Sequence, residues 1–387
     1  MNKKEIKPGI YSVGVVDWNL RSFHGYPIHK GTTYNAYLIV DEKIALIDTV
    51  KVNFAEELLD RISAIVDPSK IDYVISNHVE MDHSGSIPVV MNVAKNAKLI
   101  TSAPNGIKGL TAHYGADFPY QQVKAGDSIS LGKRTLNFIG TPMLHWPDNM
   151  LTYCPEEKIL FSNDAFGQHH TSNYIFDDQI DLPTALYDAQ GYYANILMPF
   201  GSQAKKALSV LDSMDIEIIA PSHGILWRSH IKEIVAKYQQ WANGETDDTA
   251  LVIYDTMWHS TEKMARRILE GFDRRGTKAI LYDLSVCELS DIMTELLTTR
   301  YVAVGSPTLD NNITPRVGAL LTYMKGLSPK GKKGFAFGSY GWGGQSIDIV
   351  NKELTDIGVE VILDPIKINY IPSIEQLQEI EDKVAAI

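Results

Sequence analysis

The most informative stretch of this chain is Asn77-His78-Val79-Glu80-Met81-Asp82-His83-Ser84-Gly85. Four of its side chains can bind a metal: His78, Glu80, Asp82 and His83. The segment follows residues 71–76, an apolar stretch typical of a strand, and the end of a strand supports ligands rigidly. In extended backbone the first three side chains point to one side and the fourth to the other, so two metals could be bound. The alternative interpretation is a solvated polar loop that happens to contain histidine.

Length and composition indicate a globular protein with two domains. The 387 residues exceed what one typical core contains. The net charge is −11, and the lysines and arginines are scattered, which argues against a nucleic-acid partner. Cys154 and Cys287 are the only cysteines and form no Cys-x-x-Cys motif, which fits a reducing cytosol.

Targeting and membrane signals are not evident in the sequence. Residues 1–17 lack the apolar run of a signal peptide. No stretch approaches the roughly 20 apolar residues that a membrane helix requires. We therefore expect a soluble, cytoplasmic protein without a membrane partner.

The pattern of expected elements changes near residues 241–248, where small and polar residues follow Trp241. Before them, short strands and helices at irregular spacing predict a mixed α/β sandwich. After them, five strands alternate with five helices, among them helices expected over residues 289–298 and 345–357 and a last strand expected over residues 359–363. This alternation predicts a doubly wound five-stranded parallel sheet. We expect one domain over residues 1–246 and a second over residues 249–387.

Three more candidate ligands follow apolar segments further along the chain: His145, Asp164 and His223. Each alone has an ordinary explanation, such as a buried histidine bonded to backbone or an aspartate that turns a loop. Four such loops, each at the end of an expected strand, favour a metal site instead.

With these loops in place, residues 1 to about 245 resemble the metallo-β-lactamase fold, an αββα sandwich. Its usual signature is His-x-His-x-Asp-His, followed by a histidine, a bridging aspartate and a last histidine. The chain departs from this signature at Glu80, which stands in place of the second histidine. Mixed imidazole and carboxylate ligation suits non-haem iron. Three carboxylates would also offset the charge of oxidised iron, a provision that zinc does not need because it has no redox chemistry.

The resemblance implies a division of these ligands between two iron ions. His78, Glu80 and His145 would bind one iron, Asp82, His83 and His223 the other, and Asp164 would bridge them. In some relatives the histidine that matches His83 turns away from the metal. Two further residues, His24 and Tyr193, match residues that flank the iron pocket. His24 could donate a hydrogen bond or a proton there, or could be structural.

The segment after the first expected strand of the second domain suits a phosphate. Residues 255–262 are rich in hydroxyl groups and lead into a helix, whose N-terminus offers free N–H groups and a favourable dipole. The segment lacks the motifs of nucleoside-triphosphate and dinucleotide loops. A single phosphomonoester such as that of FMN fits it. The alternative is a Ser/Thr helix cap without a ligand.

Two later loops, residues 305–312 and 338–344, fall at the carboxyl ends of expected strands, where doubly wound sheets bind ligands. Their small residues let backbone amides approach a flavin ring, and aromatic side chains flank it. Together the three loops resemble flavodoxin over residues 249–387. The expected FMN contacts are Thr256, Met257, Trp258, His259, Ser260, Thr261, Ser306, Pro307, Thr308, Asn311, Ser339, Tyr340, Gly341, Trp342, Gly343 and Gly344.

Over its whole length the chain resembles the flavodiiron protein family. The resemblance implies an oxidoreductase that reduces dioxygen to water, nitric oxide to nitrous oxide, or both. An external donor, rubredoxin or a similar small carrier, would reduce FMN, which would reduce the iron pair. Two ferrous ions and a reduced flavin hold the four electrons that dioxygen requires. The resemblance also implies a head-to-tail homodimer.

Two other functions are compatible with parts of the sequence. A dizinc hydrolase with a flavodoxin module would be expected to have histidine at position 80, where this chain has Glu80. An electron carrier that uses FMN alone would be expected to have a broken ligand set, yet all seven positions are filled.

Overall fold

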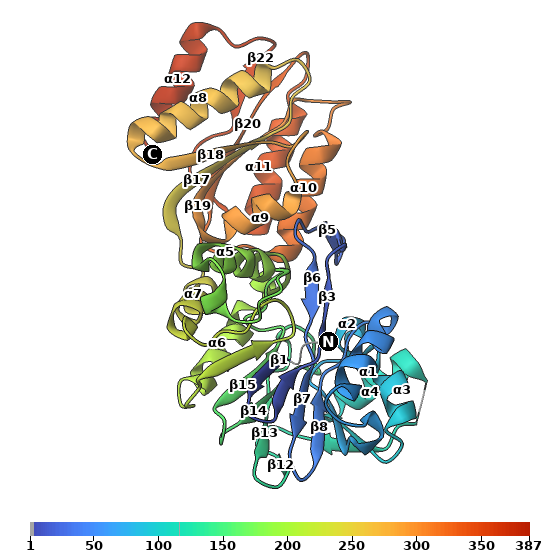
Figure 1. Ribbon diagram of the computed structural model, residues 1–387. Helices are drawn as coiled ribbons and strands as arrows, with labels where there is room; N and C mark the ends of the chain where they lie inside the picture. Colours follow the sequence, from blue (N-terminus) through green and yellow to red (C-terminus); the bar gives the residue numbers. More distant parts are fainter. Residues whose placement is uncertain (1–3, 116) are drawn as a thin grey trace. The chain divides into compact units, whose positions relative to one another are not determined.

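The computed structural model describes residues 4–115 and 117–387. It divides into two compact units, which are coloured along the chain in Figure 1. The first unit comprises Met1–Tyr192 and Ser202–Gln239, and the second comprises Tyr193–Gly201 and Gln240–Ile387. The first strand of the second unit begins at Asp247, between the two predicted domain limits.

The first unit contains two large sheets that face each other. One has the order β1-β2-β7-β8-β9-β10-β11 and the other β12-β13-β14-β15-β16. The strands of the first sheet are β1 (Lys4–Lys7), β2 (Ile10–Ser12), β7 (Tyr37–Val40), β8 (Ile44–Ile47), β9 (Tyr73–Ser76), β10 (Lys98–Ser102) and β11 (Tyr120–Val123). Those of the second are β12 (Ser128–Ser130), β13 (Thr135–Gly140), β14 (Met150–Cys154), β15 (Ile159–Asn163) and β16 (Ile218–Pro221). Two small ribbons pair β3 (Val15–Asp17) with β6 (Thr32–Tyr34), and β4 (Ser22–Phe23) with β5 (Tyr26–Pro27).

Alternating side chains create two apolar layers around the first sheet. Ile39 on β7 and Ile75 on β9 share one buried cluster with Phe138 and Phe161 of the second sheet. Leu38, the neighbour of Ile39, points to the opposite face and joins the cluster that includes the covering helices. These helices are α1 (Ala55–Ser63), α3 (Ile87–Val93) and α4 (Asn105–Tyr114). The predicted sandwich is confirmed.

The remaining helices of this part of the chain are α2 (Met81–Ser84), α5 (Leu182–Tyr192), α6 (Gly201–Leu211) and α7 (Ile231–Asn243). β8, β9 and β10 run parallel, as do β15 and β16. The carboxyl ends of parallel strands meet at one edge of a sheet, so the loops that follow them are brought together.

The second unit is a parallel sheet with helices on both faces (Figure 1). Its order is β18-β17-β19-β20-β21, and β22 also pairs with β20. The strands are β17 (Asp247–Tyr254), β18 (Lys278–Asp283), β19 (Thr299–Gly305), β20 (Lys333–Tyr340), β21 (Glu360–Val361) and β22 (Ile366–Asn369). The helices are α8 (Ser260–Arg275), α9 (Leu289–Thr298), α10 (Pro315–Leu327), α11 (Gln345–Ile357) and α12 (Ile374–Ala385).

The predicted flavodoxin-like sheet is confirmed with one difference at its edge. The fifth strand position is shared by β21 and β22, both parallel to β20. Pro365 lies between them and has no N–H to donate to the ladder, so pairing stops and resumes. In the described part of the chain, no helix has the length and apolarity needed to span a bilayer.

Candidate metal centre and flavin cleft

The candidate metal ligands lie in loops that follow strands of the first unit. His78 follows β9, Asp164 follows β15, and His223 follows β16. His145 lies in the loop between β13 and β14. Because these strands are buried and hydrogen-bonded, the ligand side chains leave from fixed backbone positions.

The ligand segment is helical after Glu80 rather than extended. α2 forms a single turn, in which the N–H of His83 donates to Glu80 O at 3.0 Å. The prediction that Asp82 points to the same side as His78 and Glu80 is therefore wrong. A helical turn rotates successive side chains by about 100° instead of 180°, and it places Asp82 beside His83.

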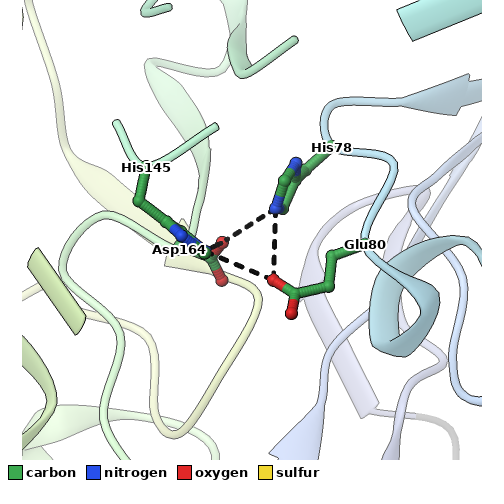
Figure 2. Close-up of side chains that lie close together, drawn as sticks. All are labelled: His78, Glu80, His145 and Asp164. Atoms are coloured by element: carbon green, nitrogen blue, oxygen red, sulfur yellow. Dashed lines mark hydrogen bonds and ion pairs between the residues drawn. The ribbon is translucent and has the colours of Figure 1, made fainter. Parts of the chain in front are cut away.

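The ligand atoms form two groups. His78, Glu80, His145 and Asp164 make one group, and Asp82, His83 and His223 make the other. Within each group the ligand atoms lie within 4.8 Å of one another. Figure 2 shows the first group, in which the two imidazoles and the two carboxylates point toward one another.

The carboxylate of Asp164 lies between the two groups. Its Oδ2 is 3.3 Å from His145 Nε2 in the first group. Its Oδ1 is 3.1 Å from His83 Nε2 and 3.6 Å from His223 Nε2 in the second group. One carboxylate that offers a different oxygen to each group has the geometry of a bridging ligand.

Hydrogen bonds on the outer side of two histidines orient their rings. His78 Nδ1 is 3.0 Å from Asp148 Oδ2, and His223 Nδ1 donates to Thr33 O at 2.6 Å. Each bond leaves Nε2 to face the ligand group, as is usual for metal-binding histidines. His83 Nδ1, by contrast, is buried and makes no hydrogen bond within the described residues. Of these three rings, that of His83 is the least fixed.

The electrostatics of the cluster favour a cation at its centre. Burial opposes charge on every member, yet the Asp148 and Glu80 carboxylates raise the pKa of His78 to about 10. Against the same burial, Asp164 and Glu80 raise the pKa of His145 to about 9. The imidazoles of His145, His24 and His78 hold the pKa of the half-buried Glu80 carboxyl well below its usual range. The carboxylates thus remain charged and stabilise positive charge on the atoms between them.

Several ligand atoms are buried and lack a hydrogen-bond partner among the described residues. They are Asp82 Oδ1 and Oδ2, Asp164 Oδ2 and His223 Nε2. Unsatisfied buried polar atoms are costly and rare in native proteins. Their convergence in two adjacent groups fits a site that binds two metal ions.

Tyr192 and Tyr193 are adjacent in sequence but differ in position. Tyr192 Oη donates to Asp164 Oδ1 at 2.8 Å. Tyr193, the tyrosine chosen from the sequence, belongs to the second unit, and its ring lies 5.3 Å from that of Trp241. The tyrosine in contact with the ligand cluster is therefore Tyr192. Sequence alone offered two adjacent tyrosines and no signal to separate them.

The expected position of His24 agrees better with the geometry. His24 lies between β4 and β5, and its Nε2 is 2.5 Å from Glu80 Oε1. Its side chain is 34% exposed, so it reaches from the ligand cluster toward solvent. Asp148, which orients His78, was not identified from the sequence, although it lies three residues after His145.

The second unit has a cleft of about 550 Å³ at the carboxyl edge of its sheet. Of the residues expected to contact FMN, those that line it are Thr256, Met257, Trp258, Ser260, Pro307, Thr308, Asn311, Ser339, Tyr340, Gly341, Trp342 and Gly343. Trp258 and Trp342 are 86% and 90% exposed. They offer large aromatic surfaces at the cleft.

Four of the expected FMN residues do not line the cleft: His259, Thr261, Ser306 and Gly344. Thr261 is buried, and its Oγ lies 3.2 Å from Ser339 Oγ, which does line it. Three lining residues were missed by the sequence reasoning: Asp310, Tyr370 and Ile371. Tyr370 and Ile371 follow β22, the strand that was not predicted, so their place at the carboxyl edge was not foreseen.

The cleft fits a phosphorylated ligand. It opens at the N-terminus of α8, where no side chain caps the free N–H groups. Thr256 Oγ1 is buried beside it without a hydrogen-bond partner among the described residues. A free hydroxyl and a long helix N-terminus are suited to a phosphate.

Comparisons with known proteins match both parts of the chain to known families. Residues 32–224 match the model of the ODP family beta lactamase, and residues 252–383 match the flavodoxin model. The chain is 47% identical to a nitric oxide reductase of Moorella thermoacetica, over 98% of each chain. It is 41% identical to the rubredoxin-oxygen oxidoreductase of Megalodesulfovibrio gigas, over 100% of this chain and 98% of that one.

A solved structure gives the same result. The flavodiiron protein of Giardia intestinalis superimposes with a TM-score of 0.96 at 36% identity, over 100% of this chain and 96% of that one. The two family matches, the relatives that span nearly the whole chain and the ligand geometry all lead to one assignment. The chain belongs to the flavodiiron protein family and is an oxidoreductase with a diiron site and FMN as its cofactors.

Proposed function

We propose that this enzyme reduces dioxygen, nitric oxide or both at an iron pair in the domain of residues 1–246. Electrons would come through FMN in the domain of residues 249–387. The observation that carries the proposal is the position of Asp164, whose two carboxylate oxygens face two separate groups of ligand atoms. The relatives named as a nitric oxide reductase and a rubredoxin-oxygen oxidoreductase support the two substrates.

Each iron position has its own set of protein ligands in this proposal. His78, Glu80 and His145 would hold one iron, Asp82, His83 and His223 would hold the other, and Asp164 would contact both. Three carboxylates among seven ligands suit a metal whose charge changes during turnover. Zinc, which does not change its charge, gains nothing from Glu80 in place of a histidine.

The surrounding side chains orient the ligands and supply protons. When bound, the iron pair and FMN supply the electrons that the reduction of either gas requires. Asp148 and Thr33 O hold two ligand histidines in the tautomer that presents Nε2. Tyr192 holds Asp164 by a hydrogen bond, and in this proposal it takes the place first expected for Tyr193. His24 Nε2 contacts Glu80 and reaches solvent, so it can carry protons toward the site.

The cleft of the second unit holds FMN in this proposal. The phosphate occupies the N-terminal end of α8 near Ser260 and Thr256. The loops that follow β19 and β20 would place small residues against the flavin ring, and Trp258 and Trp342, which line the same cleft, would offer it aromatic surfaces. This arrangement uses the carboxyl edge of the sheet, as doubly wound folds do.

A small external carrier is the proposed electron donor. The printed name of the M. gigas relative includes rubredoxin, and that relative matches this chain over nearly its full length. A rubredoxin is therefore the first donor to test. The family resemblance further supports a head-to-tail homodimer as the working assembly.

Metal and flavin analysis of the purified protein, with a visible spectrum, separates the three candidate functions. Iron plus flavin supports the proposal, zinc plus flavin supports a hydrolase, and flavin alone supports a carrier. Steady-state rates with each gas and reduced rubredoxin then establish the substrate preference.

The role of Asp164 has a direct test. Asp164→Ala should lower the iron content below two ions per chain and remove most gas reduction, because the bridge is lost, while FMN stays bound. Asp41→Ala is the control, since its side chain is also buried in the first unit but lies outside both ligand groups. Full iron loading and unaltered turnover in Asp164→Ala would refute the bridging role.

A further inference from the structure

The residues next to the metal ligands share one buried hydrogen-bond network. Asn77 precedes His78 and Asn163 precedes Asp164. Asn163 Nδ2 donates to Ser222 Oγ at 3.1 Å, and Ser222 precedes His223. Two of the four ligand loops are therefore linked directly through the residue just before the ligand.

The fourth loop joins the network through Asn149. Its Nδ2 donates to Asn163 Oδ1 at 3.2 Å, and its Oδ1 accepts from the backbone N–H of Trp146 at 2.7 Å. Trp146 directly follows His145. The side chains of Asn77, Asn149, Asn163 and Ser222 are all at least 97% buried, so water does not compete for these bonds.

Asp48 connects the two halves of this network. It follows β8 and is 2% exposed. Its Oδ1 accepts from the backbone N–H of Asn77 at 2.8 Å. Its Oδ2 accepts from Asn77 Nδ2 at 3.1 Å and from Asn163 Nδ2 at 3.4 Å. Asp48 touches no ligand side chain by these bonds, yet it holds the residues that precede His78 and Asp164.

The residue after Asp48 fixes the other end of the ligand segment. The N–H and the hydroxyl of Thr49 both donate to His83 O, at 2.8 and 2.6 Å. Asp48 and Asn163 both have a positive φ, 56° and 50°, which is uncommon for residues other than glycine. Such backbone persists only where its surroundings define it strongly, as this network does.

We propose that Asp48 is a positioning residue that holds the ligand loops of both iron sites in register, through Asn77, Asn163 and the adjoining Thr49, and so sets the spacing of the two metals. This inference rests on the proposed diiron function. A carboxylate is required because two oxygens accept three N–H groups. An asparagine offers one acceptor oxygen and turns its own NH₂ toward another donor.

The test compares Asp48→Asn with Asp41→Asn. Asp41 lies in the turn between β7 and β8, whereas Asp48 follows β8. Asp41 also accepts backbone N–H groups, from Glu42 and Arg134. Iron per chain, FMN per chain and the EPR spectrum of the half-reduced iron pair are measured for each. We expect iron affinity to fall about 10- to 100-fold in Asp48→Asn. Its half-reduced spectrum should also change, because the coupling of two bridged irons depends on their spacing, while Asp41→Asn retains both properties.

The outcomes separate this inference from the function on which it rests. Two tightly bound irons and an unchanged half-reduced spectrum in Asp48→Asn would overturn the positioning role, even if the wild-type protein contains an iron pair. A wild-type protein that does not bind two irons would overturn the proposed function itself.

A second, milder variant keeps the test decisive if Asp48→Asn does not fold. Thr152 Oγ1 donates to Asn77 Oδ1 at 2.7 Å, and Thr152→Val removes this single bond without changing the shape of the side chain. A shifted half-reduced spectrum at full iron loading supports the network's control of spacing. An unshifted spectrum in this variant contradicts it.

Discussion

Tyr192→Phe is the sharpest test of how the protein controls the bridging ligand. The hydroxyl of Tyr192 donates to Asp164 Oδ1 at 2.8 Å, and the two residues are 2% and 1% exposed. Burial and the charge of Asp164 raise the pKa of Tyr192 well above its usual value, so the hydroxyl keeps its proton and remains a donor. The substitution removes this donor and leaves the ring in place.

The size of the effect follows from the strength of the bond. A hydrogen bond to a charged group contributes roughly 1.5–3 kcal/mol. The bond draws electron density from Asp164, so its loss makes the carboxylate a stronger donor to iron and favours the ferric state. If the whole energy distinguished the two oxidation states, the reduction potential would fall by about 60–130 mV, since 59 mV corresponds to a tenfold change for one electron. Because the bond persists in both states, we expect a fall of some tens of millivolts.

Potentiometric titration of the iron pair, followed by EPR at fixed pH, measures this shift. Tyr193→Phe is the matched control, because it removes the hydroxyl of the adjacent tyrosine, whose ring packs near Trp241. An unchanged or raised potential in Tyr192→Phe refutes the reasoning. A shift found only in Tyr193→Phe would restore the residue first expected from the sequence.

Three further predictions concern the second unit. Replacing Ser260 and Thr261 together by Ala should weaken FMN binding and leave the iron content near normal. If the variant still contains as much FMN per chain as the wild type, the phosphate assignment is wrong. Gly334→Ala should lower the free energy of unfolding by roughly 1–3 kcal/mol, because the new Cβ would lie 2.2 Å from Val302 O. Gly326→Ala is the control, since the space around Gly326 is open and no such loss is expected. Chemical denaturation measures both variants, and equal stabilities would contradict the prediction. Burial lowers the pKa of Lys332 to about 7. Above that pH the unfolded chain binds a proton that the folded chain does not. The free energy of unfolding should therefore rise between about pH 7 and 10, by roughly 1.4 kcal/mol per pH unit at most. Lys332→Met should flatten this pH dependence in urea unfolding, and an unaltered slope would exclude Lys332 as the cause of the rise.

Local sequence patterns determined most of the fold of the second unit. The predicted helices at 289–298 and 345–357 have the same limits in the structure as α9 and α11. Their apolar periodicity and their flanking loops are properties of adjacent residues, which is why sequence reasoning succeeds there. The strand expected over residues 359–363 corresponds to the short β21, and β22, which follows Pro365, was not predicted. Because β22 was not predicted, Tyr370 and Ile371, which follow it, were not expected to line the flavin cleft.

The metal site shows the same contrast at the level of single side chains. The sequence identified the seven candidate ligands because each is a metal-binding residue type after an apolar segment. Strand periodicity did not predict the helical turn of α2, which places Asp82 in the second group of ligand atoms, the group that the family resemblance had implied for it. Nor did it separate Tyr192 from Tyr193, because adjacent residues of the same type differ only in the direction in which the folded backbone turns them.

The sequence by itself determined the kinds of atoms available to the site and the strands that support them, since both depend on residue type and local periodicity. Only the tertiary structure decided which atoms meet. Asp148 orients His78 from 70 positions away, and Asp48 reaches Asn163 from 115 positions away. These contacts depend on how two sheets pack against each other, and no local pattern contains that information.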